Sequence, residues 1–127
     1  MDDQQYTVHC RQVLADYAAS LAQRTGQLAE GDHLRELAHG FVTLASDAGD
    51  LFGDGPALVM RLLTHYPDFA PDFPRELLWF LGGECLHFMP DEEIAVYQQL
   101  DELRAAAATR GEVIDFAEAR AKLLKNQ

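Results

Sequence analysis

The segment from His65 to Tyr97 constrains the fold most, because it contains a helix-length apolar run, Leu77 to Met89, bounded by prolines. It also holds the only Trp, four of the seven Phe and four of the five Pro in the chain. Apolar side chains would cover most of the circumference of a helix here, and such a helix is usually buried. We therefore predict a central, mostly buried helix over about 75–88, in which Gly82 and Gly83 permit a kink or a close helix contact.

The stretch before this helix is rich in proline. Three prolines lie within residues 67–74, and proline lacks the backbone N–H that a regular helix or a central strand needs. We predict a Pro-rich linker over 67–74 that crosses the surface of the protein. Its aromatic side chains, Phe69 and Phe73, are expected to point inward.

The rest of the chain has the pattern of amphipathic helices, with apolar residues recurring at steps of three and four. Asp32 is a suitable N-cap because its carboxylate can accept hydrogen bonds from the first backbone N–H groups of a helix. The expected helices cover residues 4–28, 32–48, 56–66, 90–110 and 115–125. We predict an all-α, single-domain protein over residues 1–127, a bundle of five to six helices around the central helix.

The two cysteines, Cys10 and Cys85, are far apart in the sequence and each lies in an apolar helical pattern. This arrangement favours buried free thiols, which suit a reducing compartment. The first residues are acidic and polar and do not resemble a secretion signal. Polar residues and glycines interrupt the longest apolar run, so we expect no membrane-spanning segment. Together these features predict a cytoplasmic protein.

The net charge is −11, and the excess of acidic residues is concentrated in the middle of the chain. Residues 30–93 carry thirteen Asp or Glu against three Arg, whereas residues 94–127 carry five of each sign. A negative field repels nucleic-acid phosphates and anionic lipids, so we expect neither nucleic acid nor a membrane as a partner. Solubility is one interpretation of the acidic surface, and attraction of a basic protein partner is the other.

A metal or small-ligand site is the alternative that the ionisable residues suggest. Glu84 and His87 are three residues apart and would share one face of the central helix, with Glu76 on the same polar strip. A structural histidine that bonds to a loop carbonyl is the simpler interpretation of His87. A second Glu-x-x-His pair, Glu36 and His39, is predicted to face solvent, opposite the apolar side of its helix. We expect no bound cofactor.

Nucleophilic catalysis has little support in the sequence. The only serines, Ser20 and Ser46, lie in helical patterns rather than on a strand-to-helix turn. His9 and Cys10 are neighbours, and adjacent side chains on a helix diverge by about 100°. No phosphate-binding glycine motif is present. The sequence therefore favours a protein without catalytic residues.

Aromatic residues of the proline-rich segment give a functional hypothesis, because prolines can hold rings as rigid anchors at an interface. The candidate interaction residues are Tyr66, Phe69, Phe73, Trp79 and Phe80. The competing interpretation places these rings in the core and in a pinned linker. Our leading hypothesis is a non-enzymatic protein–protein interaction or regulatory module with an acidic surface, with a homodimer or an inhibitor of a basic partner as variants. The alternative is a small-ligand or metal-binding helical domain centred on Glu84 and His87.

Overall fold

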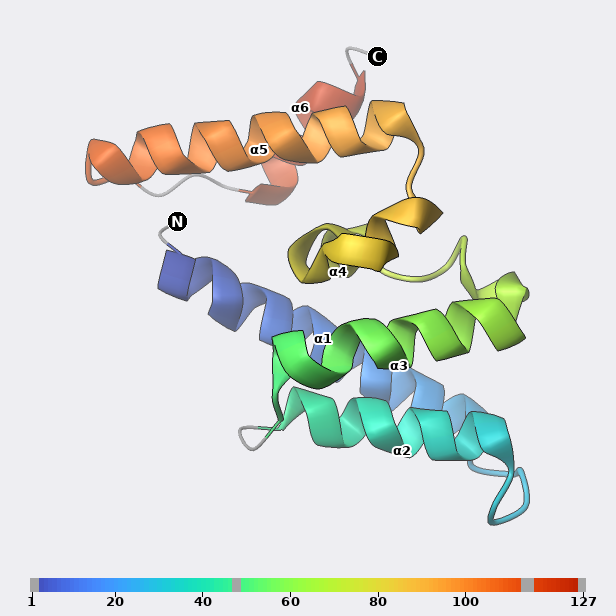
Figure 1. Cartoon of the computed structure of the whole chain (residues 1–127). Helices are drawn as coiled ribbons and strands as arrows, with labels where there is room; N and C mark the ends of the chain where they lie inside the picture. Colours follow the sequence, from blue (N-terminus) through green and yellow to red (C-terminus); the bar gives the residue numbers. More distant parts are fainter. Residues whose placement is uncertain (1–2, 47–48, 113–115, 126–127) are drawn as a thin grey trace. The chain divides into compact units, whose positions relative to one another are not determined.

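The computed structural model describes residues 3–46, 49–112 and 116–125, and every regular element among them is helical (Figure 1). The all-α prediction is therefore confirmed. The elements in chain order are α1 (Asp3–Thr25), α2 (His33–Ala45), α3 (Leu51–His65), η1 (Pro67–Phe69), α4 (Arg75–Leu81), η2 (Gly83–Phe88), α5 (Asp91–Thr109) and α6 (Phe116–Lys125), where η marks 3₁₀ helices.

Two compact units make up the chain. One comprises Cys10–Phe88, and the other comprises Met1–His9 together with Met89–Gln127. None of the described helices is long and apolar enough to cross a membrane. The organisation as one domain stays a prediction.

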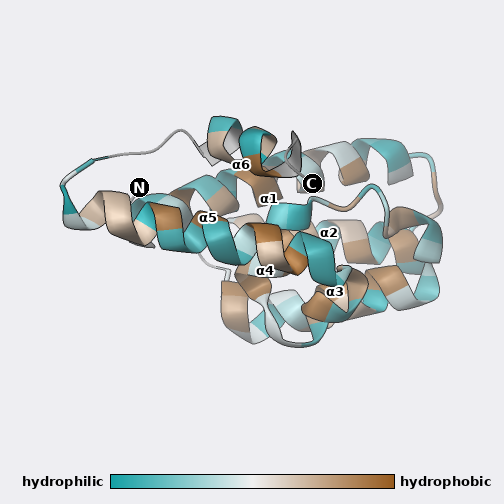
Figure 2. Ribbon diagram, turned by 90° about the horizontal axis from the view of Figure 1, so that it is seen from above, coloured by the Kyte–Doolittle hydropathy of each residue, from teal (hydrophilic) through white to brown (hydrophobic). Residues whose placement is uncertain are grey.

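The core of the Cys10–Phe88 unit is built around three aromatic rings. Tyr17 on α1 contacts Phe41 on α2 and Phe73, which precedes α4, in edge-to-face geometry. Buried leucines surround the rings: Leu14, Leu21, Leu37, Leu44, Leu62, Leu63, Leu77 and Leu78. Each fully buried large apolar side chain stabilises the fold by about 1.5–3 kcal/mol. Figures 1 and 2 show α2 beside α3, and both helices carry hydrophobic residues on one side and polar residues on another.

Local capping explains where α2 and α3 begin. Asp32 accepts a hydrogen bond from the backbone N–H of Leu34 at 3.0 Å, so the predicted cap of α2 is confirmed. The predicted start of the third helix near Pro56 is wrong, because Asp50 accepts from the N–H of Gly53 at 3.0 Å and starts α3 at Leu51. Pro56 therefore lies inside the helix.

The ends of the first two helices come earlier than predicted. The first helix ends at Thr25 rather than near residue 28. The Thr25 hydroxyl donates to the carbonyl of Leu21 at 2.9 Å, and the chain then turns at Gly26. The second helix ends at Ala45 rather than 48, because the N–H of Ser46 bonds to the carbonyl of Thr43 in a tighter turn. The predicted end of the third helix before Pro67 is confirmed at His65.

The predicted continuous helix over 75–88 is wrong. α4 ends at Leu81, and Gly82 has φ 65° and ψ −155°, a conformation that is open essentially only to glycine. The chain continues as η2, and Arg75 holds it in place by donating to the carbonyls of Ala70 and Phe88 at 2.9 and 2.7 Å. Because of this break, side chains before and after Gly82 no longer lie on one helix face. The buried helix, α4, is therefore shorter than the predicted helix over 75–88.

The linker over 67–74 is irregular apart from η1, which is a single 3₁₀ turn. Phe73 is buried, with 1% of its surface exposed, as predicted for an inward-pointing ring. Phe69 is only partly buried. One of the two linker rings therefore belongs to the core, and the other remains accessible.

In the unit that contains α5 and α6, these two helices pack against each other. The guanidinium of Arg104 lies 4.7 Å from the ring centre of Tyr6 and its NH2 is 3.7 Å from the carboxylate of Asp101. The predicted helix over 90–110 is confirmed as α5 within one residue at each end. The capping pattern predicted at Asp115 lies outside the described residues.

Candidate functional site

The predicted interaction residues do not form one surface. Phe73 is a core residue that contacts Tyr17. Only 1% of its surface is exposed, so a partner could not contact its ring and its prediction as an interface residue is wrong. Tyr66 and Phe69 contact each other next to the C-terminal end of α3. Trp79 and Phe80 lie on α4 and are partly exposed.

Phe52 and Phe80 form a partly exposed aromatic contact in the Cys10–Phe88 unit. Their ring centroids lie 5.0 Å apart with an angle of 47° between the planes, and Phe52 keeps 59% of its surface exposed. The position of Phe52 follows from the start of α3. Because α3 begins at Leu51, that side chain turns inward and is buried, and the next side chain points outward.

A glycine on α3 allows α4 to come close to this pair. Gly55 is buried, and a side-chain carbon at this position would lie only 2.9 Å from Cδ2 of Leu81. The absence of a side chain thus lets Leu81 pack directly on α3. Phe80 precedes Leu81 in α4, so this close contact brings its ring to Phe52.

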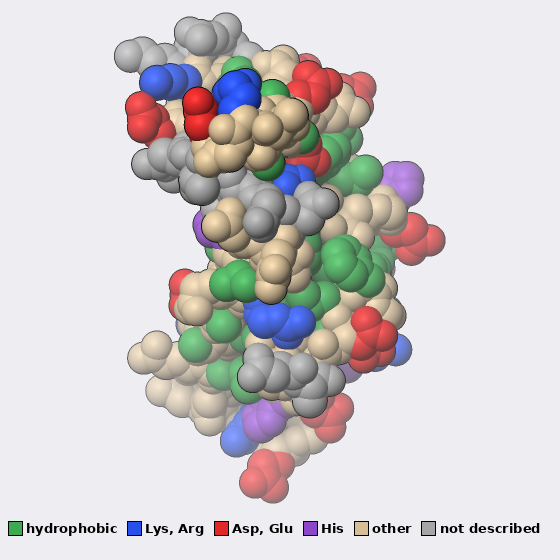
Figure 3. Space-filling view, turned by 90° about the vertical axis from the view of Figure 1, so that its left-hand side faces the viewer, with side chains coloured by type: hydrophobic (Ala, Val, Ile, Leu, Met, Phe, Trp, Pro, Cys, Tyr) green, Lys and Arg blue, Asp and Glu red, His purple; other side chains and the backbone are tan. Residues whose placement is uncertain are grey.

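Two acidic residues lie close to Phe52 in the sequence. Asp50, the N-cap, and Asp54 are both exposed. Asp54 lines a pocket with Arg61 and with residues of α2, and side chains two residues apart on a helix do not face each other. Asp50 is therefore the acidic residue considered with Phe52. Figure 3 shows hydrophobic side chains exposed on one face of the molecule, with both acidic and basic side chains around them. We use the name Phe52 surface for Phe52, Phe80 and Asp50.

A second cluster combines histidine and aromatic rings at the opposite end of α3. His33, the first residue of α2, and His65, the last residue of α3, have ring centroids 5.1 Å apart. The Tyr66 hydroxyl lies 3.3 Å from Nδ1 of His33. Phe69 meets Tyr66 edge to face, and the guanidinium of Arg24 lies 5.4 Å from the centre of the Phe69 ring. Both histidines are exposed.

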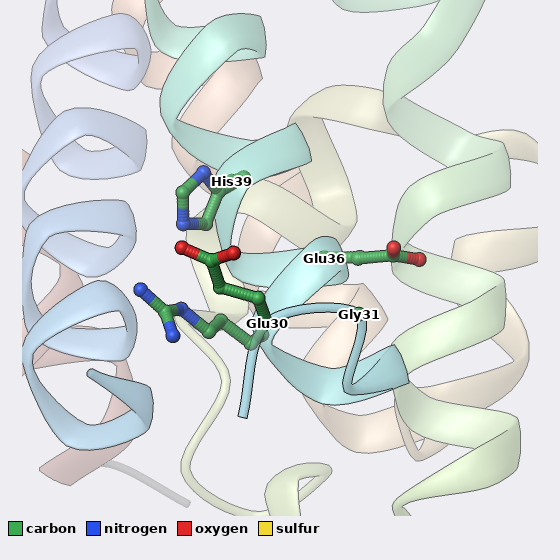
Figure 4. Close-up of a pocket in the computed structure, with 5 residues that line it drawn as sticks. Glu30, Gly31, Glu36 and His39 are labelled. Atoms are coloured by element: carbon green, nitrogen blue, oxygen red, sulfur yellow. The ribbon is translucent and has the colours of Figure 1, made fainter. Parts of the chain in front are cut away.

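A polar cavity of about 300 Å³ lies where the loop before α2 meets that helix, lined by Glu30, Gly31, Arg35, Glu36 and His39. Figure 4 shows the Glu30 carboxylate pointing toward His39, whereas Glu36 points to the other side, toward α3. Glu36 and His39 are both exposed, as predicted. Because their side chains diverge, they do not form a common ligand pair.

The residues of the predicted metal or ligand site fall on two elements. Glu76 is on α4 and is largely buried, whereas Glu84 and His87 are exposed on η2. The break at Gly82 removes the continuous polar strip that was expected to join them. Within the described ranges, no three His, Cys, Asp or Glu side chains are grouped so that they could hold a metal ion. Ligand binding at Glu84 and His87 stays a prediction.

Burial shifts the pKa of two side chains, the Cys85 thiol and the Tyr17 phenol. Burial raises the pKa of the Cys85 thiol above 9.0, and a backbone hydrogen bond partly opposes this effect. Burial also raises the pKa of the Tyr17 phenol above 10.0, and the positive charge of Arg24 partly opposes it. Both shifts favour the protonated form, so neither group is an activated nucleophile at neutral pH.

The family model of PA2817-like proteins matches residues 2–127. The chain belongs to the PA2817-like family. Comparison with curated proteins and with solved structures gives no match. The family description carries no activity, so the function has to be argued from the geometry of the chain.

Sequence reasoning missed the two residues around which these clusters are organised, Phe52 and His33. A signal for Phe52 was present, because Asp50 three residues before Gly53 is a capping arrangement that starts the helix earlier. His33 carried no comparable signal. Its contacts with His65 and Tyr66 depend on the packing of α2 against α3.

Proposed function

We propose that this PA2817-like chain is a non-enzymatic protein-binding module that docks a partner on the Phe52 surface. The observation that carries the proposal is the Phe52 ring, 59% exposed and supported on one side by Phe80 at 5.0 Å. A ring held in this way offers apolar contact area at low entropic cost, which is typical of residues that dominate interface energies.

The partner we propose is a segment that combines an apolar side chain with Lys or Arg. Asp50, the exposed N-cap of α3, is two residues from Phe52 and places a negative charge at this end of the helix. Complementary charge speeds encounter and disfavours wrong partners. A second copy of the chain fits less well, because its own Asp50 would meet a like charge. Homodimer formation through this surface is therefore an outcome that would count against the proposal.

We place this activity in the cytoplasm. Cys10 and Cys85 support that location because both are free thiols with fully buried side chains. Free cysteines persist where the environment is reducing. The simplest regulatory role for such a module is to bind and cover a basic surface of its partner.

Selection from a random peptide library on the immobilised full-length chain tests the proposal. We expect enriched peptides to carry an aromatic or aliphatic residue next to Lys or Arg. Selection on the Phe52→Asp variant should lose this motif, whereas selection on Val42→Asp should keep it. Val42 is the matched control because it is an apolar residue of the same unit with 47% exposure. Enrichment of acidic peptides, or of the same motif on both variants, would refute the proposal.

The acidic flank has its own test. Affinity of the wild-type chain for a selected peptide should fall as salt increases, since exposed charges are screened over about 10 Å at 0.1 M ionic strength. The Asp50→Asn variant keeps a side chain that can cap the helix, and it should bind more weakly and show a smaller dependence on salt. Equal salt dependence of both proteins would contradict a contribution of the Asp50 charge to docking.

A further inference from the structure

The imidazole rings of His33 and His65 are in contact, and neither residue takes part in the proposed docking function. They come from the two ends of neighbouring helices, the first residue of α2 and the last residue of α3. Their ring centroids are 5.1 Å apart and their planes make an angle of 88°. Both side chains are exposed to solvent.

The separation of the rings agrees with a shared metal ion. A zinc ion lies about 2.0–2.1 Å from an imidazole nitrogen, which puts it roughly 3.2 Å from the ring centre. Two rings that meet zinc at a tetrahedral angle then have centres about 5 Å apart. The observed 5.1 Å is close to this value, although it is also an ordinary separation for two rings in contact. The angle between the planes sets no further condition, because each ring can turn about its metal–nitrogen bond.

Tyr66 is placed to orient the His33 ring through a hydrogen bond to the ring nitrogen that would not bind the metal. Its hydroxyl oxygen lies 3.3 Å from Nδ1 of His33, and its ring stacks on the imidazole with centroids 5.9 Å apart and planes 28° apart. When Nδ1–H donates to the hydroxyl, the lone pair is left on Nε2. Metal-binding histidines are commonly oriented by such a bond from the other ring nitrogen.

Negative charge is available one turn away. Glu36 follows His33 by three residues on α2. Figure 4 shows its side chain extending toward α3, the helix that carries His65. This carboxylate favours a divalent cation electrostatically. It also disfavours an anionic ligand at the same place.

We propose that His33 and His65 chelate a zinc ion, with water in the remaining coordination positions. Imidazole nitrogen is a preferred zinc ligand, and an open site with fewer protein ligands is the kind that exchanges its ion. The described residues contribute no third His, Cys, Asp or Glu in a ligand group, so the site is open rather than structural. Bound zinc would join the N-terminal end of α2 to the C-terminal end of α3.

Zinc titration of the chelator-treated full-length chain tests this inference, with calorimetry and thermal unfolding as readouts. Zinc should bind with one ion per chain and raise the midpoint of thermal unfolding, because a ligand that binds only the folded state stabilises it. His33→Ala and His65→Ala should each weaken binding by roughly 10–100-fold, at least the loss seen when outer contacts of metal sites are removed. Tyr66→Phe should weaken binding by a smaller factor.

Two exposed histidines provide matched controls. His39 on α2 and His87 on η2 are exposed like the proposed ligands. His39→Ala and His87→Ala should bind zinc as the wild-type chain does. If zinc does not bind, or if the His33→Ala/His65→Ala double variant binds it equally well, the inference is overturned. Loss of binding only in His87→Ala would move the site to Glu84 and His87 and also overturn it.

The ring resonances of the histidines distinguish a folding defect from the loss of a ligand. In proton NMR spectra, zinc should shift the imidazole signals of His33 and His65 in the wild-type chain and leave those of His39 and His87 in place. Each alanine variant should keep the methyl spectrum of the folded protein. Zinc-induced shifts that spread over all the histidine signals would contradict a specific site.

Discussion

The ring of Phe73 meets the ring of Tyr17 edge to face, with centroids 4.9 Å apart, and the two side chains are buried together. This contact ties the proline-rich linker to α1. It explains why Phe73 serves the stability of the fold. Phe52, by contrast, contacts Phe80 at a similar distance but leaves most of its surface in solvent.

Substitution by alanine should therefore change the stability of the fold much more at Phe73 than at Phe52. We expect Phe73→Ala to lower the free energy of unfolding by about 3–5 kcal/mol, because it opens a cavity in a packed core. Phe52→Ala should change it by less than about 1 kcal/mol, since surface substitutions rarely do more. Urea denaturation followed by circular dichroism measures both. Equal losses would show that one of these two side chains has been assigned to the wrong environment.

Gly82 gives a prediction about the break between α4 and η2. Because its φ of 65° and ψ of −155° strain any residue with a side chain, Gly82→Ala should destabilise the fold by about 1–3 kcal/mol. A continuous helix over 75–88 would instead gain up to about 1 kcal/mol from the same change. The sign of the shift in urea midpoint decides between the two structures.

Gly26 is the control for this measurement. It follows α1 without a positive φ, and an added side-chain carbon would make only ordinary contacts, at 3.5 Å or more. Gly26→Ala should leave the stability nearly unchanged or raise it slightly.

The thiols give a chemical prediction. Cys10 and Cys85 are free and have 0% exposure, and burial raises the pKa of Cys85, which lowers its thiolate fraction. Ellman's reagent should detect almost no fast-reacting thiol in the native chain and two in denaturant. Rapid reaction of one thiol in the native state would mean that its surroundings open readily.

Stability should fall in alkaline solution for the same reason. A group whose pKa is raised by folding holds its proton more tightly in the folded chain than in the unfolded one. Above pH 9.0 the unfolded chain releases the Cys85 proton first, so the free energy of unfolding decreases, by at most about 1.4 kcal/mol per pH unit for one proton. Cys85→Ala should flatten this part of the profile, and Tyr17→Phe should do so above pH 10.0. Parallel profiles for variants and wild type would contradict the assignment.

The parts of the fold that depend on local chemistry could be predicted from the sequence. The Asp32 cap of α2 and the end of α3 before Pro67 both follow from neighbouring residues. The start of α3 was ambiguous, because Asp50 and Asp54 are both capping residues and only the structure shows which one caps. The sequence also did not reveal that Gly82 adopts a conformation that ends the helix, since glycine inside a helix costs only about 1 kcal/mol.

The candidate sites were harder to predict than the helices. Phe52 reaches Phe80, and His33 reaches His65, only after helices distant in the sequence have packed together. The predicted set of aromatic residues was chosen because its members are close in the sequence. Packing separated that set into a core residue, Phe73, and partly exposed ones such as Phe80.

In the proposed function, the exposed ring of Phe52 anchors a basic, apolar partner segment. Fluorescence anisotropy of one labelled peptide from the selection, titrated with wild-type, Phe52→Asp and Val42→Asp protein, measures this anchoring. We expect the peptide to bind the wild-type and Val42→Asp proteins with similar affinity and to bind Phe52→Asp at least about tenfold more weakly, a loss of about 1.4 kcal/mol. Equal affinity for all three proteins would contradict it.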